Sequence, residues 1–251
     1  MILLIDIGNS RSKYVQCVDG RLSDTDQLAN QDFNHRYFNQ YFAKASRMIV
    51  ANVAKSSLTT TLALWCAEQG IVFQQVHSEQ KKAALVSAYQ QPTTLGIDRW
   101  LALLGALHLY PNKNVLIIDA GTATTIDLLQ QDGQHQGGWI LAGIKALFNS
   151  VLNHSTLVNA ENKTVPNLAF GTNTSDNVNN ACWAATIGLI QQAISQAQQL
   201  SHIDHILLTG GNGQMLAKLL TAQGNNKDAV VQNVQFIDNL IFYGLREYVP
   251  Q

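Results

Sequence analysis

A short motif that occurs twice constrains this chain more than any other feature. Residues 2–8 (ILLIDIG) and residues 115–121 (VLIIDAG) both read as an apolar strand that ends in Asp-x-Gly, and Asp6 and Asp119 stand 113 residues apart. An apolar run that stops at a polar turn is typical of a buried strand. Because a repeated opening indicates a repeated structural unit, we expect two topologically related halves.

The rest of the pattern predicts an α/β protein. A length of 251 residues allows two compact domains, which we place at residues 1–114 and 115–251. Strands are expected at residues 2–5, 12–18, 48–53, 71–76, 115–121, 124–129, 139–142 and 205–209. Helices are expected at residues 56/57–70, 79–90, 97–110, 143–153, 175–200, 214–223 and 238–247. Residues 154–174 read as a long loop, and the last helix could pack back onto the first domain.

The polar turns after these strands have the composition of a nucleotide site. Asp6 to Ser10 and Asp119 to Thr124 each offer a carboxylate, a glycine and side-chain hydrogen-bonding groups. ATP requires close backbone N–H groups and a carboxylate that can hold Mg²⁺ or its waters, and glycine lets the backbone approach closely. A third turn, Thr209 to Gly213 (TGGNG), stands between a strand and a helix, where a flat ligand such as adenosine could lie against the backbone. Each motif alone is also compatible with a capped strand end.

Taken in order, the three motifs resemble the two phosphate motifs and the adenosine motif of the acetate kinase, sugar kinase, Hsp70 and actin superfamily. The string GIDRW at residues 96–100, together with LIDIGNSRSK near the start and DAGTATTIDL in the middle, resembles type III pantothenate kinase. The resemblance runs from residue 2 to about residue 245. One departure is Ala142, before Gly143, where the family usually has Pro; Ala removes a fixed φ there.

The resemblance implies two actin-like (ribonuclease H-like) domains with a nucleotide cleft between them. It implies ATP-dependent phosphorylation of pantothenate to 4'-phosphopantothenate, the first step of coenzyme A biosynthesis, with Asp98 as the catalytic base. The substrate contacts it implies are Tyr89, Gly96, Ile97, Asp98, Arg99 and Thr174. The ATP contacts it implies are Asp6, Ile7, Gly8, Asn9, Ser10, Arg11, Ser12, Lys13, Thr122, Gly210 and Gly211. It also implies Mg²⁺ near Asp6, through water, a monovalent cation (K⁺ or NH₄⁺) at Asp119, and a homodimer.

Plainer interpretations of three residues stay open. Asp98 could cap the helix that begins beside it, since Asp is favoured at that position, and capping and catalysis can coexist. Lys13 could be a solvated strand end instead of an ATP ligand. Trp100 is better explained as core than as a surface that stacks on substrate.

Other function classes have weaker support. A net charge of −1, with no cluster of basic residues, disfavours a nucleic-acid partner. No apolar run is long enough for a membrane helix, and Cys17, Cys66 and Cys182 read as free thiols in a reducing compartment, so we expect a cytoplasmic protein. The alternatives are a kinase of the same superfamily with another substrate, and a nucleotide-dependent regulatory or interaction protein.

Overall fold

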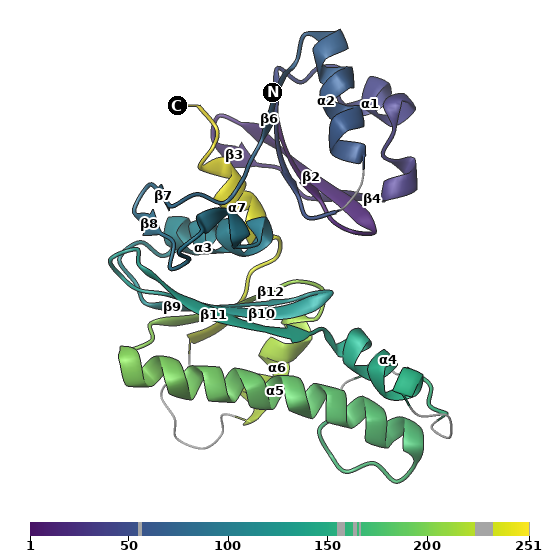
Figure 1. The fold of residues 1–251 in the computed structure, drawn as a ribbon, viewed down its shortest axis with the longest axis vertical. Coiled ribbons are helices and arrows are strands. Elements are labelled where there is room, and N and C mark those ends of the chain that lie inside the picture. The colour runs from purple at the N-terminus through teal and green to yellow at the C-terminus, as the bar shows by residue number, and fades with distance from the viewer. Residues whose placement is uncertain (55–56, 155–158, 163–164, 166, 224–232, 251) are drawn as a thin grey trace. The chain divides into compact units, whose positions relative to one another are not determined.

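The computed structural model describes residues 1–54, 57–154, 159–162, 165, 167–223 and 233–250 (Figure 1). The chain divides into two compact units. The first comprises Met1–Leu109 together with Asn239–Gln251, and the second comprises Tyr110–Asp238. The last helix, which the sequence placed in the second half or packed back onto the first, therefore belongs to the first unit.

The first unit is built on a mixed sheet with the strand order β3-β2-β1-β5-β6, and β4 pairs with β2. The central strand β1 runs antiparallel to β2 and parallel to β5, which runs parallel to β6. The strands are β1 (Ile2–Ile7), β2 (Arg11–Val18), β3 (Arg21–Leu22), β4 (Asp26–Ala29), β5 (Arg47–Asn52) and β6 (Val72–Gln75).

The second unit repeats this plan with the order β11-β10-β9-β12-β13. Here β9 runs antiparallel to β10 and parallel to β12, which runs parallel to β13. The strands are β9 (Val115–Ala120), β10 (Ala123–Leu129), β11 (His135–Ala142), β12 (His205–Thr209) and β13 (Val234–Phe236). The prediction of two topologically related halves is confirmed, since β1 and β9 hold the same place in sheets of the same order.

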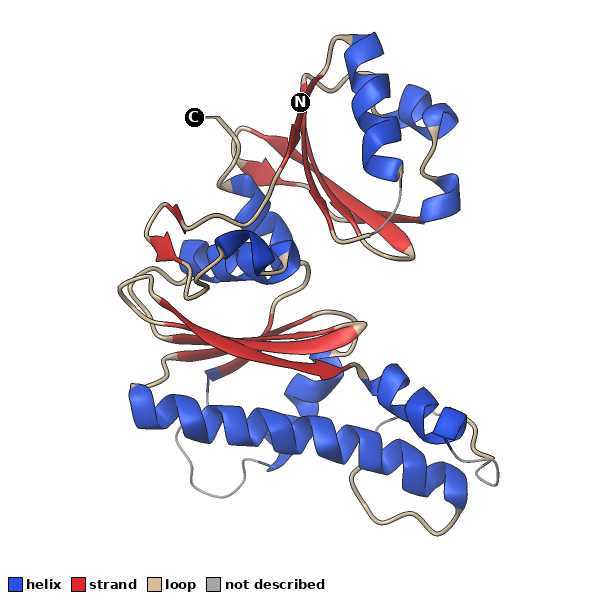
Figure 2. Ribbon diagram, viewed as in Figure 1, coloured by secondary structure: helices blue, strands red, loops and turns tan. Residues whose placement is uncertain are grey.

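Helices cover both faces of the first sheet, which explains why β1 is apolar on both sides (Figure 2). The helices of this unit are α1 (His35–Tyr41), α2 (Leu58–Gln69), α3 (Ile97–Leu109) and α7 (Leu240–Arg246). On one face, Leu3 and Ile5 pack with Phe38 of α1 and Leu62 of α2. The other face of β1 is in contact with α7.

Two glycines explain why α7 belongs to the first unit. A Cβ at Gly105 of α3 would collide with the Leu240 carbonyl oxygen, and a Cβ at Gly244 of α7 would lie 2.7 Å from the Leu101 carbonyl carbon. The two helices therefore touch backbone to backbone, at a separation that no side chain would allow.

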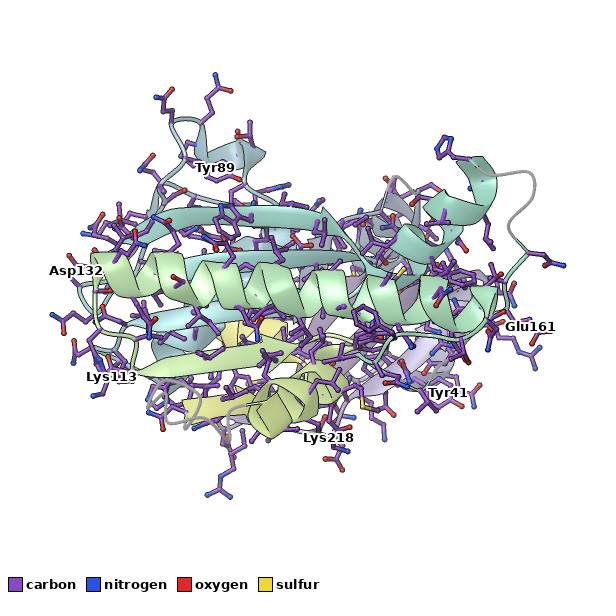
Figure 3. The ribbon with its side chains drawn as sticks, turned by 90° about the horizontal axis from the view of Figure 1, so that it is seen from below. Tyr41, Tyr89, Lys113, Asp132, Glu161 and Lys218 are labelled. Atoms are coloured by element: carbon purple, nitrogen blue, oxygen red, sulfur yellow. The ribbon has the colours of Figure 1, made fainter. Side chains whose placement is uncertain are left out.

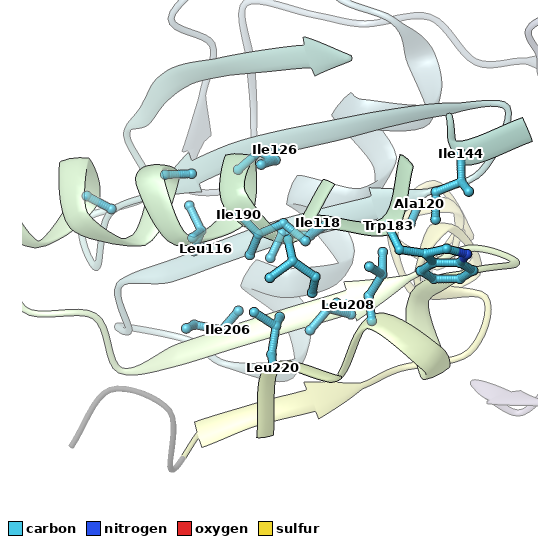
Figure 4. Packing of buried hydrophobic residues seen from close by; sticks show 14 of the residues in the cluster. Leu116, Ile118, Ala120, Ile126, Ile144, Trp183, Ile190, Ile206, Leu208 and Leu220 are labelled. Atoms are coloured by element: carbon cyan, nitrogen blue, oxygen red, sulfur yellow. The ribbon is translucent and has the colours of Figure 1, made fainter. Parts of the chain in front are cut away.

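The core of the second unit lies between its sheet and its helices (Figure 4). These helices are α4 (Ile144–His154), α5 (Thr174–Leu200) and α6 (Gly213–Gln223). Trp183 and Ile190 of α5 pack with Ile118 of β9 and Leu208 of β12. In the described part of the chain, none of the helices is long and apolar enough to cross a membrane.

The helix expected at residues 79–90 is wrong. The segment instead forms a small hairpin of β7 (Lys81–Lys82) and β8 (Leu85–Val86), with Ala83 at a φ of 50° in its turn. The Ser87 N–H donates to the Gln80 carbonyl at 2.9 Å, which closes the hairpin. Tertiary contacts override helix propensity here, because propensity is a weak prior for a short segment.

Candidate functional site

The first glycine turn, which joins β1 to β2, is braced by a residue from elsewhere in the chain. The Gly8 N–H donates to the Arg11 carbonyl at 3.0 Å, and this closes the turn. Asn30 Nδ2 donates to the Gly8 carbonyl at 2.8 Å, and Asn30 Oδ1 accepts from Ser12 Oγ at 2.9 Å. The Asn30 N–H also donates to the Ser10 carbonyl at 3.1 Å. One asparagine thus holds the turn at three points.

The residues predicted to contact ATP in this region differ in what they present. The side chains of Asn9, Ser10 and Arg11 are exposed, whereas those of Ile7 and Ser12 are buried. Because their side chains are buried, Ile7 and Ser12 can offer a ligand only their backbone groups.

Asp6 and Lys13 lie opposite each other on β1 and β2, and both are half-buried. Lys13 Nζ donates to Asn239 Oδ1 at 2.9 Å. Asn239 adopts a φ of 53° before α7, and its Nδ2 donates to Thr25 Oγ1 at 3.0 Å. In the structure, the Lys13 ammonium is thus directed toward the start of α7.

A pocket of about 450 Å³ opens where β5 and β6 end. The carboxyl ends of parallel strands are the usual ligand side of an open α/β sheet. The Val53 N–H, which follows β5, donates to the Ile7 carbonyl at 3.1 Å and so sets the pocket beside the first turn. The lining residues are Asn52, Val53, Val76, His77, Ser78, Thr93, Thr94, Leu95, Gly96, Ile97 and Asp98.

Asp98 lies in the first turn of α3 and lines this pocket. Its Oδ1 accepts from the Arg99 N–H at 2.8 Å, so the carboxylate also stabilises the start of the helix. A Cβ at Gly96 would lie 2.5 Å from the same oxygen. Glycine at position 96 therefore leaves space beside the carboxylate, and the helix contact and a place in the pocket coexist.

Arg99 and Tyr89 form a pair of their own. Arg99 is only 4% exposed, and its Nη1 donates to Tyr89 Oη at 2.7 Å. The guanidinium carbon lies 5.6 Å from the centre of the tyrosine ring. Neither side chain lines the pocket that Asp98 lines. The structure thus brings together Gly96, Ile97 and Asp98 at the pocket. It pairs Tyr89 with Arg99, while Thr174, the sixth predicted substrate contact, lies in the second unit.

The second glycine turn is held by backbone groups. The Gly121 N–H donates to the Ala123 carbonyl at 2.9 Å, and the Gly143 N–H donates to the Thr122 carbonyl at 3.1 Å. Thr122 is exposed at the tip of the turn. Ala142 ends β11 and α4 starts at Ile144, so the position where the family usually has Pro is a strand residue.

Asp119 and Gly210 meet at the carboxyl ends of β9 and β12. Gly210 has a φ of 82°, and a Cβ there would collide with Asp119 Oδ1 and lie 2.8 Å from the Ala120 carbonyl oxygen. The Asn212 N–H donates to that same carbonyl at 2.9 Å. Gly211 is exposed beside it. Glycine at position 210 therefore lets the third predicted motif approach the second.

Thr174 is the first residue of α5 and is exposed. The preceding residue, Asn173, caps the helix, since its side chain accepts from the Asp176 N–H at 2.9 Å. Glu161 lies at this end of α5 (Figure 3), where its carbonyl accepts from Asn179 Nδ2 at 2.7 Å. These hydrogen bonds fix the start of α5, and Thr174 is the exposed first residue of that helix.

Sequence reasoning missed three residues of these sites. Asn30 follows β4, and no local motif indicates that it braces a turn 22 positions earlier. Asn52 ends β5, His77 follows β6, and both line the pocket. A signal was available for His77, because a polar residue directly after a predicted buried strand is a candidate for the ligand side of the sheet.

The carboxylates present fit metal ions that bind few protein ligands. Among the described residues, no group of three or more His, Cys, Asp or Glu could hold a metal ion. Mg²⁺ keeps several waters and commonly takes one or two carboxylates plus phosphates, and the Asp6 side chain supplies one such carboxylate. Asp119 with the nearby Ala120 carbonyl offers the oxygen ligands that a hard monovalent cation prefers.

Comparison with known proteins identifies the family. Residues 2–196 match the family model described as type III pantothenate kinase. The chain belongs to the type III pantothenate kinase family. A curated type III pantothenate kinase from Colwellia psychrerythraea is 68% identical over 248 residues, which cover 99% of this chain and all of that protein. Members of this family are kinases, so the prediction of an ATP-dependent kinase is confirmed.

Solved structures share the fold. A protein from Campylobacter jejuni, described as a Baf family transcriptional activator, has a TM-score of 0.60 at 23% identity, with 98% of this chain and 96% of that one covered. A protein from Sinorhizobium meliloti, described as a 2-dehydro-3-deoxygalactonokinase, has a TM-score of 0.55 at 15% identity. The match covers 98% of this chain and 94% of that one. The predicted actin-like α/β fold is confirmed.

Proposed function

We propose that this chain transfers the γ-phosphoryl group of ATP to the hydroxyl group of pantothenate and so opens coenzyme A biosynthesis. The observation that carries the proposal is the pocket at the ends of β5 and β6, with Asp98 on its wall, in a chain 68% identical to a curated type III pantothenate kinase. The match covers 99% of this chain and all of that protein.

Asp98 is the base that accepts the proton of the pantothenate hydroxyl. Its carboxylate is already fixed by the Arg99 N–H and has space beside Gly96. A carboxylate is a weak base, but phosphoryl transfer has a loose transition state, so positioning matters more than basicity. Arg99 and Tyr89 contact the other end of pantothenate, where a guanidinium suits a carboxylate. Gly96, Ile97 and Thr174 complete the substrate contacts.

The glycine turns bind the nucleotide. The turn from Asp6 to Lys13 presents backbone N–H groups and exposed polar side chains to phosphate. Thr122, Gly210 and Gly211 are the further ATP contacts that the resemblance implies. Asp6 would hold Mg²⁺, through water, and the ion would neutralise phosphate charge. Asp119 would hold a monovalent cation, K⁺ or NH₄⁺.

We also propose that the chain forms a homodimer, as the resemblance implies. Light scattering at working concentration would show a mass near twice 27.5 kDa, and a mass near 27.5 kDa would contradict it. The cytoplasmic location expected from the sequence stays a prediction.

The test of the function is coupled ADP release with ATP, Mg²⁺ and K⁺, measured with and without pantothenate. We expect turnover that depends on pantothenate and a loss of kcat of about 10²-fold or more in Asp98→Asn, since a general base contributes about 10²- to 10⁴-fold. The amide oxygen of Asn can still accept from the Arg99 N–H, so the helix start is retained. Asp132→Asn, in the exposed turn after β10, is the matched control (Figure 3).

Turnover that ignores pantothenate would favour another substrate within the superfamily. An Asp98→Asn variant as active as the parent would leave Asp98 with only its helix contact.

A further inference from the structure

Tyr248 connects parts of the first unit that are far apart in the sequence. Its Oη accepts a hydrogen bond from Trp100 Nε1 at 2.9 Å and donates one to Glu79 Oε1 at 2.7 Å. Lys82 Nζ lies 4.2 Å from the centre of its ring. Tyr248 stands beyond residues 2–196, the stretch that matches the family model. One side chain thus contacts α3, Glu79 just before β7, and Lys82 of β7 itself.

The chemistry of the partners fixes the direction of these hydrogen bonds. An indole N–H can only donate and a carboxylate can only accept, so the tyrosine proton must point to Glu79. Burial, and then the hydrogen bond to Glu79, raise the pKa of Tyr248, so the hydroxyl keeps its proton at neutral pH. Trp100 is fully buried. Phenylalanine at position 248 would leave the buried indole N–H with no acceptor from this side chain.

From Glu79 and Lys82 the connection runs through the hairpin to Tyr89. The Ser87 N–H donates to the Gln80 carbonyl at 2.9 Å, so the hairpin closes between these two residues. Ser87 Oγ then accepts from the Tyr89 N–H at 3.2 Å. The position of Tyr89 therefore depends on where the hairpin lies.

The connection closes on α3. Arg99 stands next to Trp100 in that helix, and its guanidinium donates to Tyr89 Oη at 2.7 Å. β8 is also in contact with α3. The contacts thus run in a closed ring from Tyr248 through the hairpin to Tyr89 and Arg99, and back through Trp100. Tyr89 and Arg99 are two of the residues expected to bind pantothenate.

We propose that Tyr248 is a positioning residue for pantothenate: it holds the hairpin of β7 and β8 against α3 and thereby sets the Tyr89–Arg99 pair. This inference rests on the proposed function, in which that pair contacts pantothenate. Tyr248 acts through its neighbours and touches neither the nucleotide turn nor Asp98. Its loss should therefore affect binding of pantothenate more than binding of ATP.

The experiment compares Tyr248→Phe with Tyr243→Phe. Tyr243 lies on α7 and stacks on His108, with ring centres 6.4 Å apart, so the same change is made there away from the hairpin. Tyr248→Phe should raise the KM for pantothenate about 5- to 20-fold, the effect of about one to two hydrogen bonds. The KM for ATP should stay within about 2-fold, and Tyr243→Phe should leave both constants within about 2-fold.

Amide hydrogen exchange provides the readout that a general loss of stability would not produce. In Tyr248→Phe, residues 79–90 should exchange faster while β1 and β5 keep their protection. Lys82→Met, which keeps the alkyl stem and removes the charge over the ring, should raise the pantothenate KM by a smaller factor, about 2- to 3-fold.

Two failures are distinguishable. A wild type without turnover of pantothenate overturns the proposed function. A wild type with that turnover, and a Tyr248→Phe variant whose pantothenate KM or hairpin exchange is unchanged, overturns this inference alone. A variant in which both KM values rise equally also overturns it, because Tyr248 would then support the fold without selecting between the substrates.

Discussion

The two units use the same strand order but hold their glycine turns by different means. In the first unit the turn after β1 is braced by a side chain, since Asn30 binds the Gly8 carbonyl and the Ser12 hydroxyl. In the second unit the turn after β9 is held by backbone N–H groups, such as that of Gly143 on the Thr122 carbonyl. The neighbouring turn after β12 approaches it closely, and any side chain at Gly210 of that turn would collide with Asp119.

The difference shows that two copies of one sequence motif need not be stabilised by the same kind of contact. A turn braced by a side chain can be weakened in steps, by removing one hydrogen bond at a time. A turn built from close backbone contacts tolerates few substitutions at its glycines, because even one added methyl group must displace the main chain. We therefore expect substitutions at the closely packed glycines of the second unit to be more damaging than those in the first turn.

The largest effect is expected for Gly210→Ala. The new Cβ would collide with Asp119 Oδ1 and would also require a φ of 82° from a residue other than glycine. We expect a loss of about 2–4 kcal/mol in the free energy of unfolding, measured by urea denaturation. Activation by K⁺ should also weaken, because the carboxylate must move.

Gly137→Ala is the matched control for this substitution. Gly137 has a φ of 88° in the same unit, but a Cβ there would meet nothing within 4 Å. Gly137→Ala should lower the free energy of unfolding only by the backbone strain, about 1 kcal/mol. Equal losses in the two variants would mean that the close approach to Asp119 has no energetic consequence.

The next effect tests the side-chain brace of the first turn. Asn30→Ala removes the hydrogen bonds to Gly8 and Ser12 and leaves the buried Ser12 hydroxyl without that acceptor. We expect a loss of about 1.5–3 kcal/mol in stability and a several-fold rise in the KM for ATP. Asn30→Asp keeps an acceptor for the Ser12 hydroxyl, so it should lose less stability than Asn30→Ala. An unchanged KM for ATP in both variants would contradict a role of this turn in nucleotide binding.

A smaller effect separates the two interpretations of Lys13. Lys13→Met keeps the alkyl stem and removes the ammonium group that donates to Asn239. If Lys13 contacts phosphate, the KM for ATP should rise about 5- to 10-fold, the effect of one charge-assisted hydrogen bond. Steady-state kinetics at fixed pantothenate would measure this. No change would identify Lys13 as a strand-end residue that only anchors the start of α7.

The smallest effect is the pH dependence of stability that arises at the start of β9, for which the start of β1 is the comparison. Before β9, Asp204 accepts from the Asn114 N–H at 2.8 Å and from Lys113 Nζ at 3.2 Å. Although burial raises the pKa of Asp204, the Asn114 N–H and the Lys113 ammonium lower it below its ordinary value overall. At the start of β1 the corresponding contact is neutral, with Ser46 donating to the Met1 carbonyl.

A carboxyl group with a lowered pKa stabilises the fold above its unfolded pKa, about 3.9, and that contribution is lost as pH falls through the folded value. Asp204→Asn should therefore cost about 1 kcal/mol at pH 7 and progressively less in acid, toward zero. Urea denaturation at several pH values measures the difference. A cost that stays constant with pH would contradict the ionic origin of the contact.

The sequence predicted what is local in this fold. The buried strands of ILLIDIG and VLIIDAG, the Gly70 stop of α2 and the long helix α5 all follow from periodicity and capping within a few residues. The two glycine turns and the position of Asp98 at the start of α3 follow in the same way. Alternation along β2 could also have placed Ser12 among the buried residues, on the face opposite to Lys13.

Features that depend on distant partners could not be predicted. Asn30 braces a turn only because β4 pairs with β2. Residues 79–90 prefer a helix by composition, but they form a hairpin whose partners, Tyr248 and α3, lie far away in the sequence or beyond the segment. The last helix joins the first unit because Gly105 and Gly244 allow backbone contact, which no pattern within residues 238–247 reveals.

The identity of the product tests the central claim most directly. Purified protein would be incubated with ATP, Mg²⁺, K⁺ and pantothenate, and the product examined by mass spectrometry beside the Asp98→Asn variant. We predict a monophosphate ester of pantothenate in amounts equal to the ADP released, formed at least about 10²-fold more slowly by the variant. ADP release without the ester, or equal rates for the two proteins, would contradict the account.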